Sequence, residues 1–215
     1  NNFITTDPSI IDGVNKDNFY FFFVPVDKNI ECFEVYNLRP KNDLFYAMSH
    51  GVNRAVLKEG TEDSRLGFLD KLIKKIPNIK YDFYGFSNRQ PIWGNDFNNA
   101  LTNSKMGLNL SRGRPTKYYS SNRIASIMGN GLLTFIDEKT YLNDFFSNKE
   151  IIFYNNLEDL TYKLNKYKVD KKEGKKIAKK GRDKYLKYFN SDIVSEFLIN
   201  KTFELKSKNK VIWSN

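Results

Sequence analysis

Short apolar runs of strand length alternate with helical patterns along most of this chain. The runs cover residues 19–24, 44–48, 79–84, 106–110, 132–136 and 151–154. Helical periodicity covers residues 64–75, 97–103, 121–128, 141–146 and 157–167. Short strands that are apolar throughout are typical of parallel sheets with helices on both faces. The pattern predicts an α/β fold: a doubly wound, mostly parallel Rossmann-like sheet with C-terminal helices.

The composition supports a folded domain with its own core. The chain has 215 residues, of which 40% are apolar and 15% aromatic, as in folded globular proteins. Its longest apolar runs are far below the roughly 20 residues that span a bilayer. Cys32 and His50, the single cysteine and the single histidine, exclude an internal disulfide and are too few for a zinc site. We therefore expect no metal, no cofactor and a reducing, cytoplasmic compartment.

The net charge of +10 is concentrated in the last quarter of the chain. Residues 1–161 hold 19 basic and 19 acidic side chains, whereas residues 162–215 hold 16 basic and 6 acidic ones. Residues 171–200 read as helices that have one narrow apolar face and lysines elsewhere. This pattern favours a solvated amphipathic helix packed over the sheet. Contact with nucleic acid or with an anionic membrane surface is the alternative, and nucleic acid is not the favoured partner.

Arginine stands out against this lysine-rich background. Lysines outnumber arginines 27 to 8, yet Arg112, Arg114 and Arg123 fall within one stretch of twelve positions, 112–123. A lysine serves as a plain solvated charge, whereas the planar fork of arginine suits bidentate contact with phosphate or carboxylate. The three arginines therefore indicate an anion-binding segment.

Ligands of open α/β sheets bind beyond the carboxyl ends of the strands, and two early loops qualify. The first carries Ser49, His50 and Gly51 and leads to a helix with Arg65 in its first turn. Gly51 permits close backbone approach and Arg65 would neutralise a bound phosphate, although a lone His50 is also explained as a turn residue held by backbone. The second loop, residues 86–94, is aromatic and polar. Its Trp93 fits either a flat base or packing against the next helix.

The third loop, its helix and the apolar strand that follows, residues 111–137, are the most informative segment. A basic loop followed by a capped helix N-terminus forms an anion site, with phosphate the expected anion. Helix capping alone explains the serines at its start and the glycines at its end, but not the arginines, lysine and tyrosines gathered there. The candidate ligand-binding residues are Arg112, Lys117, Tyr119, Ser120, Ser121, Asn122, Arg123, Asn130 and Gly131.

Several common catalytic and cofactor motifs are missing from the sequence. There is no GxGxxG after an early strand, no GxxxxGK[ST] and no G-x-S-x-G. Dinucleotide, P-loop and nucleophile-elbow chemistry therefore lose support. No residue is assigned a catalytic role.

The order of short motifs resembles the C-terminal domain of group 1 glycosyltransferases of the GT-B fold, and among them the spore-maturation-type glycosyltransferase-like proteins. The similarity covers roughly residues 19–200 and is strongest over 104–190. In that pattern an Arg-led helix ends at a small-Gly pair, a strand ends in Asp, and a Lys-Glu-apolar strand precedes a Leu-rich helix. The matching positions are Phe23 to Asp27, Arg65, Phe68-Leu69, Arg123, Asn130-Gly131, Asp137, Lys149-Glu150 and residues 157–164.

The resemblance implies a nucleotide-sugar donor bound by this domain, without a metal ion. Ser120, Ser121, Asn122 and Arg123 would meet the diphosphate, and His50 and Gly51 would lie near the sugar-phosphate. A separate N-terminal domain would supply the acceptor site and often the catalytic base. Residues 1–30 would then lead from that missing domain, 31–200 would form the donor-binding domain, and 201–215 would be a tail. Surface glycan or lipopolysaccharide synthesis, peripheral to the inner membrane face, is the expected setting.

One position departs from the family pattern. Members usually carry a glutamate three residues after the helix-leading arginine, where it contacts the ribose hydroxyls, and this chain has Ser126 there. The resemblance therefore leaves ribose recognition and the identity of the nucleotide open. It also leaves a non-catalytic interaction domain, or a nucleic-acid-binding one with a basic C-terminal helix, as the alternative function.

Overall fold

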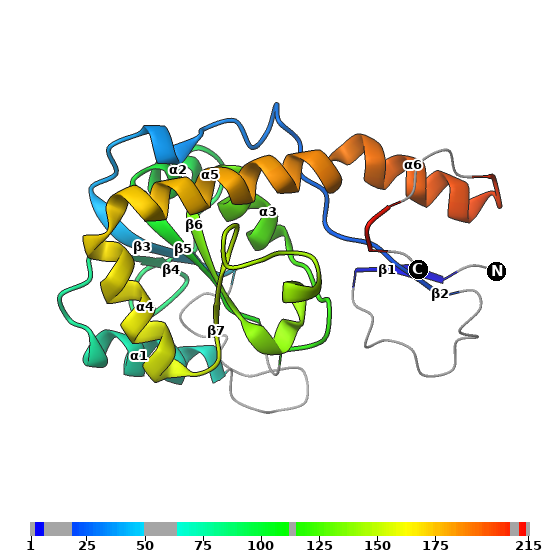
Figure 1. The fold of residues 1–215 in the computed structure, drawn as a ribbon. Helices are drawn as coiled ribbons and strands as arrows, with labels where there is room; N and C mark the ends of the chain where they lie inside the picture. Colours follow the sequence, from blue (N-terminus) through cyan, green and yellow to red (C-terminus); the bar gives the residue numbers. More distant parts are fainter. Residues whose placement is uncertain (1–2, 7–18, 50–63, 112–114, 207–210, 214–215) are drawn as a thin grey trace.

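The computed structural model describes residues 3–6, 19–49, 64–111, 115–206 and 211–213 and has a five-stranded parallel sheet at its centre (Figure 1). The strand order is β4-β3-β5-β6-β7, and each neighbouring pair is parallel. The strands are β3 (Asn42–Ala47), β4 (Tyr81–Tyr84), β5 (Ser104–Asn109), β6 (Leu133–Asp137) and β7 (Ile152–Tyr154). The parallel α/β sheet predicted from the alternating pattern is confirmed.

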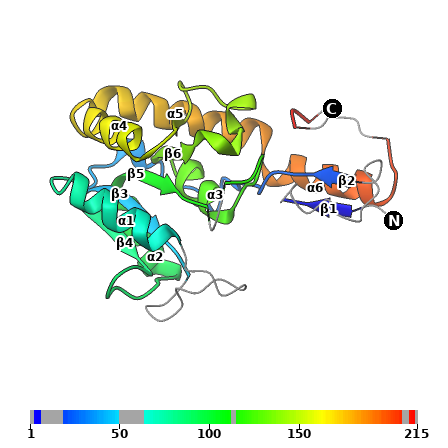
Figure 2. The ribbon, with the colours of Figure 1, turned by 90° about the horizontal axis from the view of Figure 1, so that it is seen from below.

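Helices cover both faces of the sheet (Figures 1 and 2). The helices α1 and α4 pack on one face, and α2 and α3 pack on the other. Their bounds are α1 (Ser64–Lys75), α2 (Gly94–Thr102), α3 (Asn122–Gly129), α4 (Leu157–Val169), α5 (Lys171–Tyr188) and α6 (Ser191–Thr202). Helix α1 has the same bounds as its sequence prediction, because its apolar positions recur at helical spacing without a competing turn signal.

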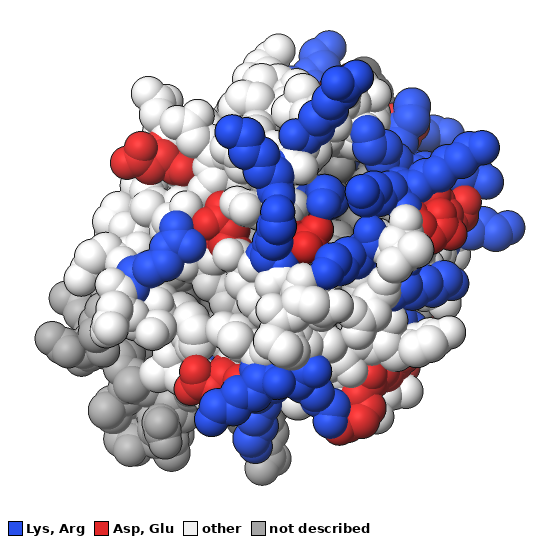
Figure 3. All heavy atoms as spheres, turned by 90° about the vertical axis from the view of Figure 1, so that its left-hand side faces the viewer, with Lys and Arg blue, Asp and Glu red and all other residues white. Residues whose placement is uncertain are grey.

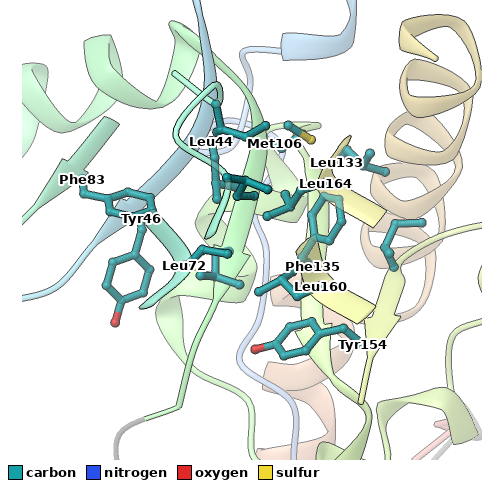
Figure 4. Packing of buried hydrophobic residues seen from close by; sticks show 14 of the residues in the cluster. Leu44, Tyr46, Leu72, Phe83, Met106, Leu133, Phe135, Tyr154, Leu160 and Leu164 are labelled. Atoms are coloured by element: carbon teal, nitrogen blue, oxygen red, sulfur yellow. The ribbon is translucent and has the colours of Figure 1, made fainter. Parts of the chain in front are cut away.

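Alternate residues of each strand supply the two halves of the core. Leu44 and Tyr46 of β3 point to the face covered by α1 and α4, where Leu72 and Leu160 meet them (Figure 4). Phe45, between the two, belongs to the opposite cluster with residues of α2 and α3. Both faces of the sheet are therefore buried, which explains why its strands are apolar without alternation.

The predicted strand at residues 19–24 does not join the main sheet. Only Phe19–Phe21 form a strand, β2, which pairs in parallel with β1 (Phe3–Thr5) in a separate two-stranded sheet. The chain then turns to pack with the C-terminal helices: the ring centroid of the fully buried Phe23 lies 4.4 Å from that of Phe189, and the Val26 backbone N–H donates to the Phe189 carbonyl. Burial against α5 and α6 outweighs pairing in the main sheet.

The predicted helix at residues 141–146 is also corrected. In place of one helix, the chain forms two short 3-10 turns here, Glu138–Thr140 and Leu142–Asp144. Tyr141, between them, has a φ of 55°, which lies in the left-handed region and interrupts a right-handed helix. The apolar spacing of the stretch instead places Leu142 and Phe146 in the core.

The basic helix α5 packs on the domain as the amphipathic pattern predicted. Gly174, Ile177, Ala178, Gly181 and Tyr185 are buried, and most of its lysines are exposed. Its first half belongs to the core cluster of α1 and α4, and its second half to the cluster that includes α3 and α6. Every described helix is too short or too polar to cross a membrane.

Candidate functional site

The topology places a switch point at the carboxyl ends of β3 and β5. These strands are neighbours, yet β3 is followed in sequence by β4 on one side, and β5 by β6 on the other. The connections therefore leave in opposite directions, which opens the edge of the sheet at the point where open α/β folds bind ligands. Two of the three predicted ligand loops begin there: the one after β3 and the one after β5.

Arg123 joins the two strands at this switch point. Its Nε donates to the Ala47 carbonyl at the end of β3 (3.0 Å), and one terminal nitrogen donates to the Leu110 carbonyl just after β5 (2.9 Å). The guanidinium carbon also lies 4.8 Å from the centre of the Tyr46 ring, within cation–π range. These contacts hold a permanent positive charge in one orientation at the switch point of the sheet.

The N-terminus of α3 points to the same edge. Ser121 occupies the N-cap position but makes no side-chain hydrogen bond to the helix. Its hydroxyl lies instead 3.3 Å from the Oδ1 atom of Asn109 at the end of β5. Asn122 follows and is exposed. Because the Ser121 oxygen does not cap the helix, the first-turn N–H groups and the helix dipole favour an anion at this end.

The loop after β3 contributes its described residues to this edge. Ser49 is exposed two residues beyond Ala47, and Arg65 is buried in the first turn of α1, with 4% of its surface exposed. His50, Gly51 and Arg112 lie outside the described residues.

Three of the predicted ligand residues serve the fold instead. The Ser120 hydroxyl is buried and accepts a hydrogen bond from the Val24 backbone N–H (2.9 Å). Asn130 and Gly131 follow the end of α3, at the amino edge of the sheet, opposite to Arg123. The Asn130 side chain accepts from the Phe33 N–H and donates to the Ser126 carbonyl, and Gly131 has a φ of 79°, which suits the residue after a helix C-cap. The structure thus gives these three residues contacts within the fold, and their role as ligand contacts stays a prediction.

The loop before α3 has a strained turn at Tyr118. Its φ is 62°, which costs energy for a residue with a side chain. The Tyr118 hydroxyl donates to the Asp144 carboxylate, and this hydrogen bond, together with burial, raises the pKa of Tyr118 to about 12. Lys117, which is exposed, lies over the rings of Tyr118 and Tyr141. Tyr119 is partly buried, and both candidates lie on this turn just before the N-terminus of α3.

Asp137 and Tyr154 are candidates that the site prediction did not include. They are cross-strand partners at the carboxyl ends of β6 and β7. Burial raises the pKa of the Asp137 carboxyl, although the Lys139 backbone N–H, which donates to it (2.9 Å), acts in the opposite direction. A partly buried carboxylate with a raised pKa at the carboxyl edge of the sheet is a candidate proton carrier. Its place at the end of an apolar strand was the available sequence signal.

The hydroxyl of Tyr154 is buried without a hydrogen-bond partner among the described residues. Burial, with Asp137 and Tyr46 nearby, raises its pKa far above the usual range.

We expect Tyr154→Phe to raise the free energy of unfolding by about 1 kcal/mol, because it removes an unsatisfied buried polar group without changing the ring. Urea unfolding measures this. A loss of stability would instead show that the hydroxyl has a partner in solution.

The loop after β4 is attached to that strand through Arg89, whereas Trp93 at its end is exposed to solvent. Arg89 pairs with Asp82 (3.0 Å) and its guanidinium carbon lies 3.9 Å from the centre of the Tyr84 ring. Trp93 is 68% exposed at the N-cap of α2, so the alternative in which it packs against the helix is not what the structure shows. Among the described residues, no group of three His, Cys, Asp or Glu side chains is arranged to hold a metal ion.

The comparisons with known proteins agree with this architecture. A family model described as glycosyl transferase-like matches residues 65–200. A search of curated proteins returned no match.

Solved structures of glycosyltransferases have a similar fold. HepE of Anabaena, in complex with UDP, has a TM-score of 0.61 at 11% identity, over 94% of this chain and 63% of that one. An alpha-glucosyltransferase in complex with UDP and a 13-mer DNA has a TM-score of 0.64 at 11% identity, over 93% and 63%. A glycosyltransferase of Rickettsia africae has a TM-score of 0.57 at 14% identity, over 96% and 64%. This chain therefore spans less than two thirds of the length of each.

Proposed function

This chain belongs to the glycosyl transferase-like family, and we propose that it forms the donor-binding part of a glycosyltransferase, which transfers a sugar from a nucleotide-diphosphate sugar to an acceptor. The observation that carries this proposal is the position of Arg123. It joins the carboxyl ends of β3 and β5 through the Ala47 and Leu110 carbonyls. The charge, the switch point and the N-terminus of α3 coincide there, which favours a diphosphate.

The chemistry required of such a site is stabilisation of the departing nucleotide diphosphate. As the bond between sugar and phosphate breaks, negative charge builds up on the phosphate oxygens. Fixed positive groups aimed at that position lower the barrier because they need no reorganisation during the reaction. Arg123 and the first turn of α3 would supply this stabilisation, with Lys117 on the adjacent loop, so we propose that transfer proceeds without a metal ion.

Recognition of the ribose would differ from that in the group 1 glycosyltransferases that the sequence resembles, which usually use a glutamate three residues after the helix-leading arginine. Ser126 lies one turn into α3, and its hydroxyl donates to the Asn122 carbonyl (3.0 Å). It offers no carboxylate to the ribose hydroxyls. The base and ribose would then rely on other groups at this edge, such as the exposed Ser49. The complexes of HepE and of the alpha-glucosyltransferase with UDP make UDP the first nucleotide to try.

A binding titration tests the proposal. We expect UDP to bind the wild-type chain, and Arg123→Ala to weaken binding by roughly 10- to 100-fold, as for loss of a charge-assisted hydrogen bond. Arg123→Lys, which keeps the charge, should lie between the two. Isothermal titration calorimetry measures the affinities, and circular dichroism checks that the variants are folded.

The matched control is Arg39→Ala, an exposed arginine before the amino end of β3. It should leave the UDP affinity unchanged. The donor-binding proposal fails if UDP, GDP, ADP and CDP all fail to bind the wild type, or if Arg123→Ala binds as tightly as Arg39→Ala.

We further propose that the acceptor site and the catalytic base come from another domain of the full-length protein. The similar structures extend beyond this chain, which spans 63% of HepE. The present chain would then bind donor but transfer sugar weakly or not at all by itself. Surface glycan or lipopolysaccharide synthesis remains our proposal for the pathway.

A further inference from the structure

A pocket lies at the amino edge of the sheet, opposite to Arg123. It has a volume of about 250 Å³ and is lined by the starts of β5, β6 and α5, by the end of α4 and by residues 35–40. This volume corresponds to roughly eight water molecules at about 30 Å³ each, and it is close to the lower end of small-molecule pockets, roughly 300 Å³. The proposed donor site makes no use of it.

The walls of this amino-edge pocket are largely apolar. Met106 and Leu133, at the starts of β5 and β6, are buried parts of its lining, and the aromatic rings of Tyr36 and Tyr167 belong to it as well. Gly174 of α5 contributes no side chain, and a Cβ built there would lie 3.4 Å from Leu133 and 3.8 Å from Tyr167. The pocket therefore suits a flat or short apolar body.

Four basic side chains, Arg39, Lys105, Lys171 and Lys175, belong to the same lining. Lys105 is neutralised by Asp43 (2.7 Å), and Lys175 donates to the Leu38 carbonyl (3.3 Å). For Arg39 and Lys171, both exposed, the structure records no ion pair with a described residue. The face in Figure 3, which is the left-hand side of Figure 1 where α4 meets α5, accordingly carries many lysine and arginine side chains.

We propose that this pocket binds a small phosphate monoester with a flat or short apolar body. The apolar walls would cover the body, and Arg39, Lys171 and Lys175 would face the phosphate at the mouth. A phosphate monoester carries close to two negative charges at neutral pH, which matches Arg39 and Lys171, the two basic side chains of the lining for which the structure records neither an ion pair nor a hydrogen bond with a described residue. An uncharged compound would leave these cations unmatched, and inorganic phosphate would leave the apolar walls uncovered.

Charge reversal on α5 tests the recognition of the phosphate. The probe is 1-naphthyl phosphate, titrated by its fluorescence in the presence of saturating UDP, so that any binding at the donor edge is blocked. The double variant Lys171→Glu with Lys175→Glu should weaken binding by about tenfold or more. The matched control, Lys172→Glu with Lys176→Glu, makes the same change of net charge on the same helix at positions outside the pocket lining, and should change the affinity by less than about threefold.

Filling the pocket tests its location. Gly174→Leu should abolish binding of 1-naphthyl phosphate while the protein stays folded, because leucine has a higher helix propensity than glycine by roughly 1 kcal/mol. The uncharged 1-naphthol and inorganic phosphate should both bind at least about tenfold more weakly than 1-naphthyl phosphate. Full binding by a folded Gly174→Leu variant, equal losses in the two lysine pairs, or no binding by the wild type would each overturn the proposal. Retained UDP affinity in Gly174→Leu separates this site from the donor site.

Discussion

The Gly181→Ala variant is expected to lose about 3 kcal/mol of stability. Gly181 lies in the middle of α5, where the helix crosses the chain entering β7. A Cβ at this position would lie 2.2 Å from the carbonyl oxygen of Glu150 and 3.0 Å from the Cε atom of Met128. The first contact is with backbone, so α5 must move away from the sheet to accommodate a single methyl group, and the packing of its whole buried face suffers.

Gly174→Ala is the matched control for this prediction, on the same helix. The added Cβ meets only ordinary contacts of 3.4 Å and 3.8 Å. Without a clash, the higher helix propensity of alanine should raise stability by up to about 1 kcal/mol. Urea unfolding followed by circular dichroism measures the free energy of unfolding of both variants. In thermal unfolding, the midpoint temperatures should shift by roughly 2–4 °C per kcal/mol. If both variants changed stability by the same amount, close packing of α5 at Gly181 would be disproved.

Arg182→Ala is expected to cost about 3 kcal/mol, because three acceptors depend on one buried guanidinium. Arg182 is 7% exposed. Its Nε donates to the Gly129 carbonyl at the end of α3 (2.8 Å), and its terminal nitrogens donate to the Glu31 carbonyl (3.1 Å) and the Glu34 carboxylate (3.2 Å). Without them, the Gly129 carbonyl would be left unsatisfied and the segment that carries Glu31 and Glu34 would lose its attachment to α5.

Two milder variants separate the contributions of charge and geometry. Arg182→Lys keeps the charge, but an ammonium group does not reproduce the planar fork that serves three acceptors, so an intermediate loss is expected. Glu34→Gln removes only the ion pair, and since the Glu34 side chain is 45% exposed, it should cost less than about 1 kcal/mol. Guanidinium unfolding gives the order. A loss in Glu34→Gln equal to that in Arg182→Ala would show that the ion pair, not the carbonyl contacts, holds the segment.

Local patterns in the sequence predicted the strands of the central sheet because strands that are buried on both faces consist mostly of apolar residues. The strands from β3 to β7 read as short apolar runs, and α1 reads as a helix of 3.6-residue period. The two predictions that were wrong, the strand at residues 19–24 and the helix at residues 141–146, concern apolar patterns that fit more than one structure. Residues 19–24 are apolar because Phe23 packs in the core against Tyr185 and Phe189 at the end of α5, and residues 141–146 have helical spacing around a left-handed Tyr141.

The candidate site could be predicted only in part. The sequence pointed to residues 111–137 because arginines gather there, and the structure brings Arg123 and Ser121 to the carboxyl edge. Asn130 lies far from Arg123 and Ser121 in the structure, because α3 runs from one edge of the sheet to the other. Two residues seven apart in sequence are therefore at opposite edges, a consequence of helix geometry at 1.5 Å per residue.

The sequence by itself determined the α/β class, the order of the elements and the basic segment before α3, since these depend on periodicity and residue type along the chain. Only the tertiary structure decided which polar groups face a ligand and which face the protein. Ser120 and Ser121 show the difference: the hydroxyl of the first accepts from Val24, 96 residues away in sequence, and that of the second lies beside Asn109 at the open edge. Such partners are set by how β5, α3 and the N-terminal segment pack together. Local sequence patterns cannot predict them, because the partner residues can be far apart in the sequence.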